Sequence, residues 1–173
     1  MIIRQATKKD LSALMPIFEE ARGTIASLGI NQWQDGYPNE AVISEDIAVG
    51  RSYCVENAEG RVCASFALID DGEPTYDVIT DGAWQTGDRK AGYLAIHRVA
   101  IAVASRGQGI ASAVMSFAQD CARARGLTSL RIDTHEGNVV MRRMLEKNGF
   151  SLCGVIFLQN GDPRVAYERI VLA

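Results

Sequence analysis

Hydrophobic residues recur every three or four positions in two stretches of this chain, a spacing that places them on one face of an α-helix. One stretch covers residues 11–25 and is followed by Gly29, and the other covers residues 110–122 and is followed by Gly126. Glycine just after such a stretch is a common helix end, because it adopts the left-handed conformation without steric cost. The pattern therefore predicts two long helices, and residues 40–49 are predicted to form a shorter one.

Apolar or alternating runs predict the strands. Within one of them, Val99–Val103 is predicted to be a strand buried on both faces. Asn57–Gly60 and Asn160–Pro163 are typical hairpin connections, whereas Asp70–Ala91 is polar, rich in turn residues and long for a plain connection. The predicted strands cover residues 1–5, 51–56, 61–69, 93–103, 129–133, 151–158 and 164–171.

Asn138, a residue type favoured at the N-cap, predicts the start of a fourth helix after the strand at 129–133. The predicted elements then follow one another as a strand, two helices, three strands, and then helix, strand, helix and two strands. A meander of strands followed by a β-α-β unit predicts an α/β fold of the mixed α+β kind, with a mixed sheet and helices on both faces. No linker or internal repeat divides the sequence, so residues 1–173 are expected to form a single domain.

Composition narrows the class of protein. Hydrophobic residues make up 47% of the chain, which argues against disorder, and the net charge of −3 comes without a basic cluster. Nucleic acid and acidic membrane surfaces are therefore not expected as partners. No apolar run has transmembrane length, and the four cysteines lack the spacing of a metal site or a disulfide framework. We therefore expect a reduced, cytoplasmic protein without a bound metal.

The segment Arg106-Gly107-Gln108-Gly109-Ile110-Ala111 connects a predicted strand to the helix that begins at Ile110. Its two glycines let backbone N–H groups come close to a ligand, because no Cβ stands in the way. The first turn of the helix adds unpaired N–H groups and the positive end of the helix dipole, and Arg106 adds a cation. These features predict a site for a phosphate-containing ligand.

Two kinds of phosphate site are compatible with these glycines. A dinucleotide-binding fingerprint needs a third glycine or alanine where Ser112 stands, although Asp133 lies where a ribose-binding carboxylate is expected. That fingerprint normally opens a domain of several β-α units, whereas few residues follow Asp133. A nucleotide-binding P-loop is excluded, since the chain contains no Gly-Lys-Ser or Gly-Lys-Thr.

The second kind of site fits more of the chain. The pattern Arg-x-x-Gly-x-Ala at residues 106–111, the strand that ends Leu130–Thr134, Asn138 and the segment Glu146–Phe150 resemble the GCN5-related N-acetyltransferase (GNAT) superfamily. The resemblance is specific over residues 97–150 and follows the element order over most of the chain. It implies a GNAT-type central mixed sheet that splays between two parallel strands. It also implies acetyl-coenzyme A (acetyl-CoA) as donor and a primary amine as acceptor.

The same resemblance implies which residues bind acetyl-CoA. The backbone of Val99, Ala100 and Ile101 contacts the acetyl and pantetheine end, where the family's strand commonly carries a bulge. Asn138, a good helix N-cap in its own right, also contacts the cofactor. The pyrophosphate is bound by Arg106, Gly107, Gln108, Gly109, Ile110 and Ala111.

Acetyl transfer to an amine is helped by a proton acceptor, since most amines are protonated at neutral pH. Asp133 ends its strand, and its place five residues before Asn138 matches a position where some family members carry a catalytic acidic residue. A structural Asp133 that caps a turn or pairs with Arg131 is the alternative. His97 on the central strand is a second candidate. His135 is a third, on the face of Asp133 if the strand continues that far.

One position departs from the family pattern. Many members carry a tyrosine seven residues after the asparagine, as general acid toward the coenzyme A thiolate, and this chain has Leu145 there. The thiolate therefore leaves unassisted, takes a proton from water, or uses a tyrosine from elsewhere. Tyr76, Tyr93 and Tyr167 are candidates that the sequence does not rank.

The acceptor side is the least defined part of the sequence. Trp33 and Tyr37 follow the first helix, in the region that lines the acceptor side in proteins of this resemblance, and Asp35 and Glu40 lie close by to attract a cationic amine. Packing of Trp33 on the first helix is the alternative, in which case the pocket is expected under Asp70–Ala91.

These observations predict an acyltransferase, namely an acetyl-CoA-dependent N-acetyltransferase that acts on a primary amine of a small molecule. One alternative is an acetyltransferase that modifies a protein N-terminus or lysine. Another is a non-catalytic coenzyme A-binding or sensor module, which Leu145 makes conceivable, and a nicotinamide-binding fragment is a third. The resemblance makes a homodimer a possible assembly.

Overall fold

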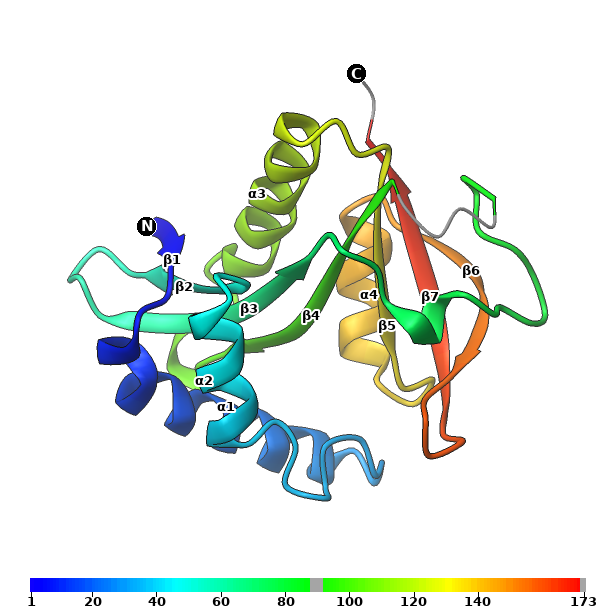
Figure 1. Cartoon of the computed structure of the whole chain (residues 1–173). Helices are drawn as coiled ribbons and strands as arrows, with labels where there is room; N and C mark the ends of the chain where they lie inside the picture. Colours follow the sequence, from blue (N-terminus) through cyan, green and yellow to red (C-terminus); the bar gives the residue numbers. More distant parts are fainter. Residues whose placement is uncertain (88–91, 172–173) are drawn as a thin grey trace. The chain divides into compact units, whose positions relative to one another are not determined.

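The computed structural model describes residues 1–87 and 92–171 of the 173-residue chain (Figure 1). Contacts divide the chain into two compact units. Unit 1 consists of Met1–Leu68 and Arg98–Val114, and unit 2 consists of Ile69–His97 and Met115–Ala173. A single domain over residues 1–173 stays a prediction.

The elements follow one another in the order that the sequence predicts. Strand β4 (Tyr93–Ile101) and helix α3 (Ile110–Ala124) contribute residues to both units. The other elements of unit 1 are β1 (Ile2–Gln5), η1 (Lys8–Asp10), α1 (Leu11–Ser27), α2 (Glu40–Ala48), β2 (Ser52–Glu56), β3 (Val62–Ile69, whose last residue belongs to unit 2) and η3 (Val103–Ser105). Those of unit 2 are η2 (Pro74–Tyr76), β5 (Ser129–Thr134), α4 (Val139–Lys147), β6 (Ser151–Phe157) and β7 (Pro163–Ile170).

Hydrogen bonding connects the strands in the order β1-β2-β3-β4-β5-β7-β6, which makes a seven-stranded mixed sheet in the described part of the chain. The pairs β1–β2, β2–β3, β5–β7 and β6–β7 are antiparallel, and β4 pairs with β5 in parallel. The parallel pairing covers only Tyr93–Ala95 against Ser129–Arg131, although both strands continue beyond it. The central strands are therefore hydrogen-bonded at their beginnings and leave the ladder before their carboxyl ends, as the predicted splay requires.

The core of unit 1 lies between the sheet and helices α1 and α2. Leu14 and Phe18 of α1 and Ile43 of α2 are buried against Cys54 of β2 and Ala100 of β4. The hydrophobic stripe of α1 thus faces the sheet, which is the usual reason for a helical period in an amphipathic segment.

The sheet of unit 2 is covered on both faces. Because side chains alternate along a strand, Ile132 of β5 and its neighbour Tyr167 of β7 point to one face, where α4 packs and Arg142 donates to the Tyr167 hydroxyl at 3.0 Å. The opposite face carries Tyr93 and Ala166 and is covered by buried side chains of the segment after β3, among them Tyr76.

Segment 79–82 packs tightly on strand β6 within unit 2. The backbones of Thr80 and Val155 exchange two hydrogen bonds of 2.8 Å. A Cβ added to Gly154 would lie 2.5 Å from the carbonyl oxygen of Thr80, and one added to Gly82 would lie 1.9 Å from that of Cys153. Only glycine allows this approach. The predicted long segment Asp70–Ala91 therefore has ordered structure over residues 70–87, and its last four residues lie outside the described residues.

One sequence prediction on the central strand is wrong. Val99–Val103 is not a continuous buried strand: β4 ends at Ile101, η3 begins at Val103, and the side chain of Val103 is 52% exposed. The cause is a turn, because Ser105 and Arg106 donate backbone hydrogen bonds to Ala102 and Val103. The N–H of Val103 is satisfied by the carboxylate of Glu20 in α1, at 2.7 Å.

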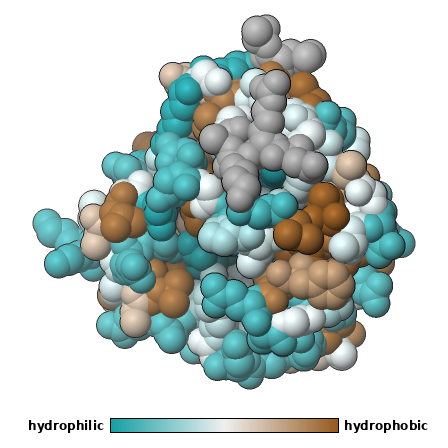
Figure 2. Space-filling view, turned by 45° about the vertical axis from the view of Figure 1, so that its right-hand side comes forward, coloured by the Kyte–Doolittle hydropathy of each residue, from teal (hydrophilic) through white to brown (hydrophobic). Residues whose placement is uncertain are grey.

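Hydrophobic side chains on the face shown in Figure 2 form separate patches among hydrophilic ones. Among the described residues, no helix is both long and apolar enough to cross a membrane.

Candidate functional site

The glycine loop of unit 1 has the backbone geometry that the sequence predicts. Gly107 and Gly109 have φ angles of 75° and 78°, a region that side chains other than glycine rarely adopt, and residues 106–109 are exposed. A Cβ at either glycine would meet nothing within 4 Å, so the backbone conformation and not space requires glycine. Helix α3 begins at Ile110 without an acidic residue in its first turn, which leaves its positive end uncompensated.

Arg106 is exposed and also has partners inside unit 1. Its Nη2 donates to Thr24 Oγ1 of α1 at 2.9 Å, and its Nε lies 3.4 Å from the carbonyl oxygen of Ile101. The guanidinium is therefore tied to α1 beside the loop, with solvent on its open side.

Strand β4 carries a backbone irregularity at the predicted acetyl contact. Arg98 has a φ angle of 54°, which is uncommon for a residue other than glycine and typical of a bulge, and Val99–Ile101 follow directly. Its guanidinium forms a bidentate ion pair with Asp46 of α2, at 2.7 and 2.9 Å, and donates to the Tyr37 hydroxyl at 2.7 Å. Burial lowers the pKa of Arg98, but Tyr37 and Asp46 outweigh burial and raise it above its usual value.

The two predicted acceptor-side aromatics both have packing partners in unit 1. Trp33 lies edge-on to Phe18 of α1 and to Tyr37, at ring distances of 6.2 and 6.3 Å, and packs against the core of that unit. Tyr37 is the hydrogen-bond acceptor of Arg98. These contacts account for both residues by packing, and their substrate-binding role stays a prediction.

Two of the three predicted proton acceptors lie together in unit 2, on either side of Tyr76. Asp133 Oδ1 accepts a hydrogen bond of 2.7 Å from the Tyr76 hydroxyl, and the ring of His97 stacks on the Tyr76 ring at 5.7 Å and 20°. Tyr76 is 2% exposed, and burial together with the neighbouring Asp133 raises its pKa well above 10. The phenol therefore stays protonated and donates to Asp133 throughout the physiological range.

Glu73 completes this cluster, although no motif or hydrophobic period points to it. Its Oε2 lies 3.3 Å from His97 Nε2, and both side chains are less than one-fifth exposed. The backbone N–H of Glu73 donates to the Tyr93 hydroxyl at 2.9 Å, which anchors the segment before η2 to β4. We call Glu73, Tyr76, His97 and Asp133 the acidic cluster.

His135 does not lie on the continuation of the strand. Strand β5 ends at Thr134, so the condition for His135 to share the face of Asp133 is not met. Its Nδ1 instead accepts the N–H of Gly137 at 3.0 Å, in the turn before α4. Asn138 is the N-cap of α4, because its side chain accepts the N–H of Met141 at 3.2 Å. A turn and an ion pair were the structural alternatives for Asp133, but Arg131 pairs with Glu168 instead.

Leu145 is fully buried in α4, so the position of the family's tyrosine is part of the hydrophobic core here. Tyr167 of β7 contacts α4, where its hydroxyl accepts a hydrogen bond of 3.0 Å from Arg142 and donates one of 3.4 Å to Glu146. No tyrosine of this helix thus takes the place of the missing acid.

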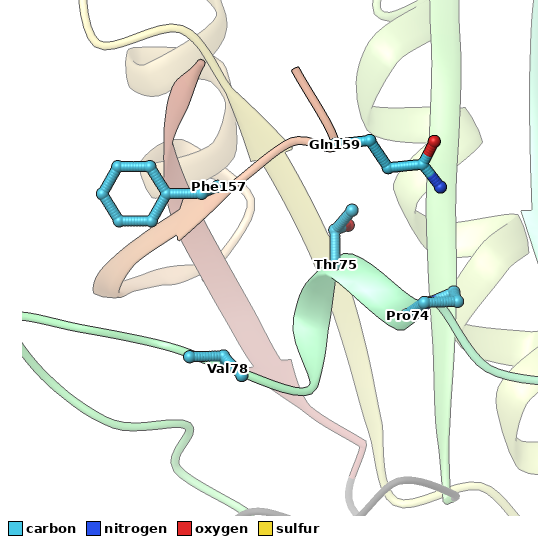
Figure 3. Close-up of a pocket in the computed structure, with 5 residues that line it drawn as sticks. All are labelled: Pro74, Thr75, Val78, Phe157 and Gln159. Carbon is cyan, nitrogen blue, oxygen red and sulfur yellow. The ribbon is translucent and has the colours of Figure 1, made fainter. Parts of the chain in front are cut away.

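A small pocket lies beside the acidic cluster in unit 2. Pro74, Thr75 and Val78 of η2 and the residues after it form one wall, and Phe157 and Gln159 of the β6–β7 hairpin form the other (Figure 3). Its volume is about 260 Å³. Thr75 and Tyr76 are neighbours in the chain, so the pocket and the cluster share element η2.

A search of the described residues finds no group of three or more histidine, cysteine, aspartate or glutamate side chains arranged to hold a metal ion. The four cysteines are free thiols, and burial raises the pKa of Cys54 to about 11.

The deciding observation comes from comparison with known families. The model of the Acetyltransferase (GNAT) family matches residues 13–150 of this chain. The chain belongs to the GNAT family. It is therefore an acetyltransferase, and the resemblance drawn from residues 97–150 is confirmed. The loop at residues 106–111 and the turn at Glu146–Phe150 both lie inside the matched region.

Relatives of known structure and sequence agree with this assignment. The structure of a GNAT-family acetyltransferase from Streptococcus agalactiae is 37% identical to this chain, covers 99% of it and 96% of its own chain, and superposes with a TM-score of 0.87. The predicted fold class is thereby confirmed.

Curated relatives match over shorter stretches. GCN5-related N-acetyltransferase 6 of Arabidopsis thaliana is 32% identical over 68 residues, which are 39% of this chain and 23% of that protein. Streptothricin acetyltransferase of Escherichia coli is 31% identical over 74 residues, which are 42% of each chain. The matched part thus spans less than half of either curated relative.

The sequence predicted the loop at 106–111 and the helix cap Asn138. It did not predict three residues with prominent contacts, which are Glu73 of the acidic cluster and the ion-paired residues Asp46 and Arg98. Arg98, Asp46 and Glu73 follow no motif and no helical or strand period. A residue with a charged side chain inside an apolar strand, such as Arg98 between His97 and Val99, is the one signal that deserved more weight, since an isolated buried charge needs a partner.

Proposed function

We propose that this GNAT acetyltransferase transfers the acetyl group of acetyl-CoA to a primary amine of a small molecule. The observation that carries the proposal is the acidic cluster of unit 2. Two carboxylates, Glu73 and Asp133, and the imidazole of His97 lie around one buried tyrosine. Carboxylates attract an ammonium group, and a carboxylate or an imidazole can take its proton.

The glycine loop supports acetyl-CoA as the donor. Two positive-φ glycines in an exposed loop, the N-terminal end of α3 and the guanidinium of Arg106 together suit a pyrophosphate. The family uses acetyl-CoA as co-substrate, and we assign its pyrophosphate to residues 106–111. Val99–Ile101 and Asn138 are the further proposed contacts.

The proposed reaction needs one proton acceptor and one set of hydrogen-bond donors. The amine nitrogen forms a bond to the acetyl carbon while the bond from that carbon to sulfur breaks, and backbone N–H groups of Val99–Ile101 stabilise the charge on the carbonyl oxygen. The proton of the amine passes to Asp133 or to His97. Since Leu145 is apolar, the departing thiolate takes its proton from solvent.

A small acceptor fits the dimensions beside the cluster. The pocket of about 260 Å³ at Pro74, Thr75, Val78, Phe157 and Gln159 is below the size of a typical drug-sized ligand site. It suits the apolar part of a compact amine. The streptothricin acetyltransferase relative is named for a small molecule, which favours the same class of acceptor.

The test is an acetyl-transfer assay with purified protein, in which release of free thiol is followed across a panel of small amines, lysine peptides and peptides with free N-termini. Turnover with a small amine at a kcat/KM well above that with any peptide supports the proposal. Preference for a peptide would assign the protein-modifying alternative. Coenzyme A binding by calorimetry without turnover would assign the non-catalytic module.

Two further expectations belong to the same proposal. The cytoplasm remains the proposed location, in keeping with four free thiols. A homodimer is the proposed assembly, and analytical ultracentrifugation distinguishes it from a monomer.

A further inference from the structure

The left-handed conformation of Arg98 is the least expected backbone feature of unit 1. Its φ angle of 54° is common for glycine and rare for a long side chain. It occurs one residue before the backbone segment Val99–Ile101, to which the proposed function assigns the acetyl group. Such outliers persist only where the surrounding structure holds them, and they are concentrated at functional sites.

The side chain of Arg98 is held by three contacts from sequence-distant elements. Asp46 Oδ1 of α2 accepts a hydrogen bond of 2.9 Å from Arg98 Nη2, and its Oδ2 lies 2.7 Å from Nε in the ion pair. The Tyr37 hydroxyl accepts a hydrogen bond of 2.7 Å from Nη1. The side chains of Arg98 and Asp46 are 11% and 7% exposed. A planar guanidinium that is bound by two different side chains has a fixed orientation. This fixed orientation of the side chain limits the φ and ψ angles that Arg98 can adopt.

We propose that Asp46 and Tyr37 are positioning residues, which hold Arg98 in the left-handed conformation and thereby direct the N–H groups of Val99–Ile101 toward the thioester carbonyl. This inference rests on the proposed function for the identity of the reacting group. We call the contacts of Asp46 and Tyr37 with Arg98 the clamp. Its effect on the backbone of β4 can be tested without any acceptor.

The decisive comparison is between two variants that lose the same side chain. In the background D46N, which removes the buried negative charge, Arg98→Gly restores free access to the left-handed region, whereas Arg98→Ala does not. Both variants lack the guanidinium, so they differ in how readily residue 98, as glycine or as alanine, adopts a positive φ angle. We expect D46N/R98G to retain at least a tenfold higher kcat than D46N/R98A, a difference in line with the roughly 10²–10³-fold loss that follows removal of one oxyanion donor.

Controls separate positioning from stability. Asp10→Asn breaks a comparable bidentate pair with Arg4 elsewhere in unit 1, at 2.8 and 2.9 Å, and serves as the matched variant. It is expected to lower the melting temperature without lowering kcat per folded molecule. Tyr37→Phe removes one of the three contacts and is expected to lower kcat less than D46N does. Coenzyme A affinity should fall far less than kcat in all variants of the clamp, because the pyrophosphate is assigned to residues 106–111, outside the displaced segment 98–101.

A second readout does not depend on turnover. In ¹⁵N–¹H spectra of the protein without ligand, the amide signals of residues 98–101 are expected to move further from wild type in D46N/R98A than in D46N/R98G. Equal shifts, or equal kcat values for the two double variants, would overturn the clamp. If the shifts differ as expected while no amine is acetylated by the wild type, the clamp stands and the proposed function fails.

Discussion

At the scale of single residues, Tyr76 decides how the two predicted proton acceptors differ. It donates to Asp133 at 2.7 Å and stacks on His97, and its raised pKa keeps the proton on the phenol. The other carboxylate oxygen of Asp133, Oδ2, is the one that we propose to accept the proton of the amine. We predict that Asp133→Asn lowers kcat by about 10²–10⁴-fold, the usual effect of losing a general base. Coenzyme A affinity, measured by calorimetry, should stay the same.

His97→Gln is the parallel variant in this experiment. If Asp133 takes the proton, His97→Gln lowers kcat much less than Asp133→Asn and leaves the pH dependence of kcat/KM in place. A larger loss in His97→Gln, with a weakened pH dependence, would move the role to the Glu73–His97 pair, which are 3.3 Å apart. Wild-type turnover by Asp133→Asn at every pH would contradict the assignment of this carboxylate.

A second residue-scale prediction concerns the pocket that we propose for the acceptor. Trp33 packs on Phe18, whereas Phe157 is half exposed beside Pro74 and Thr75. We predict that Phe157→Ala raises the KM for the amine several-fold and leaves the melting temperature unchanged, since an exposed ring contributes little to the core. Trp33→Ala should lower the melting temperature and leave both KM values in place. A raised amine KM for Trp33→Ala alone would return the acceptor site to the loop after α1.

At the scale of elements, the loop before α3 is the proposed pyrophosphate site, because its two glycines have positive φ angles and nothing within 4 Å of an added Cβ. Asp at position 109 places a negative charge beside the proposed pyrophosphate, so Gly109→Asp is predicted to reduce coenzyme A binding below detection in calorimetry. Gly60→Asp is the matched control, because Gly60 has a φ angle of 73° and nothing within 4 Å of an added Cβ. The two variants share the strain and the added charge, so equal coenzyme A affinities would refute the assignment.

Hydrophobic periods predicted the existence and order of the elements well, because most helices and strands here bury one face or both. The end of β4 shows where this reasoning stops. Val103 is apolar and follows an apolar run, yet the turn at Ala102–Arg106 and the hydrogen bond from Glu20 end the strand at Ile101. Both causes are tertiary contacts, which a local pattern does not contain.

At the scale of the whole molecule, the parts of the site that the sequence predicted are those that one segment builds alone. The loop 106–111 and the N-cap Asn138 depend on local backbone geometry, so their residue types identify them. The pairs Glu73–His97 and Asp46–Arg98 join residues 24 and 52 positions apart. Strand pairing and helix packing bring the two residues of each pair together. The pairs therefore become visible only in the structure.

Stability against acid is the last property that the structure predicts, and Glu168 of unit 2 contributes to it. Burial would raise the pKa of Glu168, but hydrogen bonds from Thr86, Ser129 and Arg131 outweigh burial and lower it. A lowered folded-state pKa contributes stability that is present above the unfolded value of about 4.3 and is lost as the pH falls through the folded value.

Glu168→Gln leaves Arg131 buried without its counter-charge, so we predict a loss of about 3–5 kcal/mol in the free energy of unfolding at pH 7. This difference from wild type should shrink as the pH falls from 5 to 3, because Glu168 takes up its proton in the unfolded chain at a higher pH than in the folded protein. Urea denaturation across this range measures both effects. Glu59→Gln, in an exposed pair with Arg61 at 3.7 Å, is the control and should change the free energy by less than about 1 kcal/mol at every pH. A difference between Glu168→Gln and wild type that stays constant down to pH 3 would mean that the ion pair does not set the acid limit of this fold.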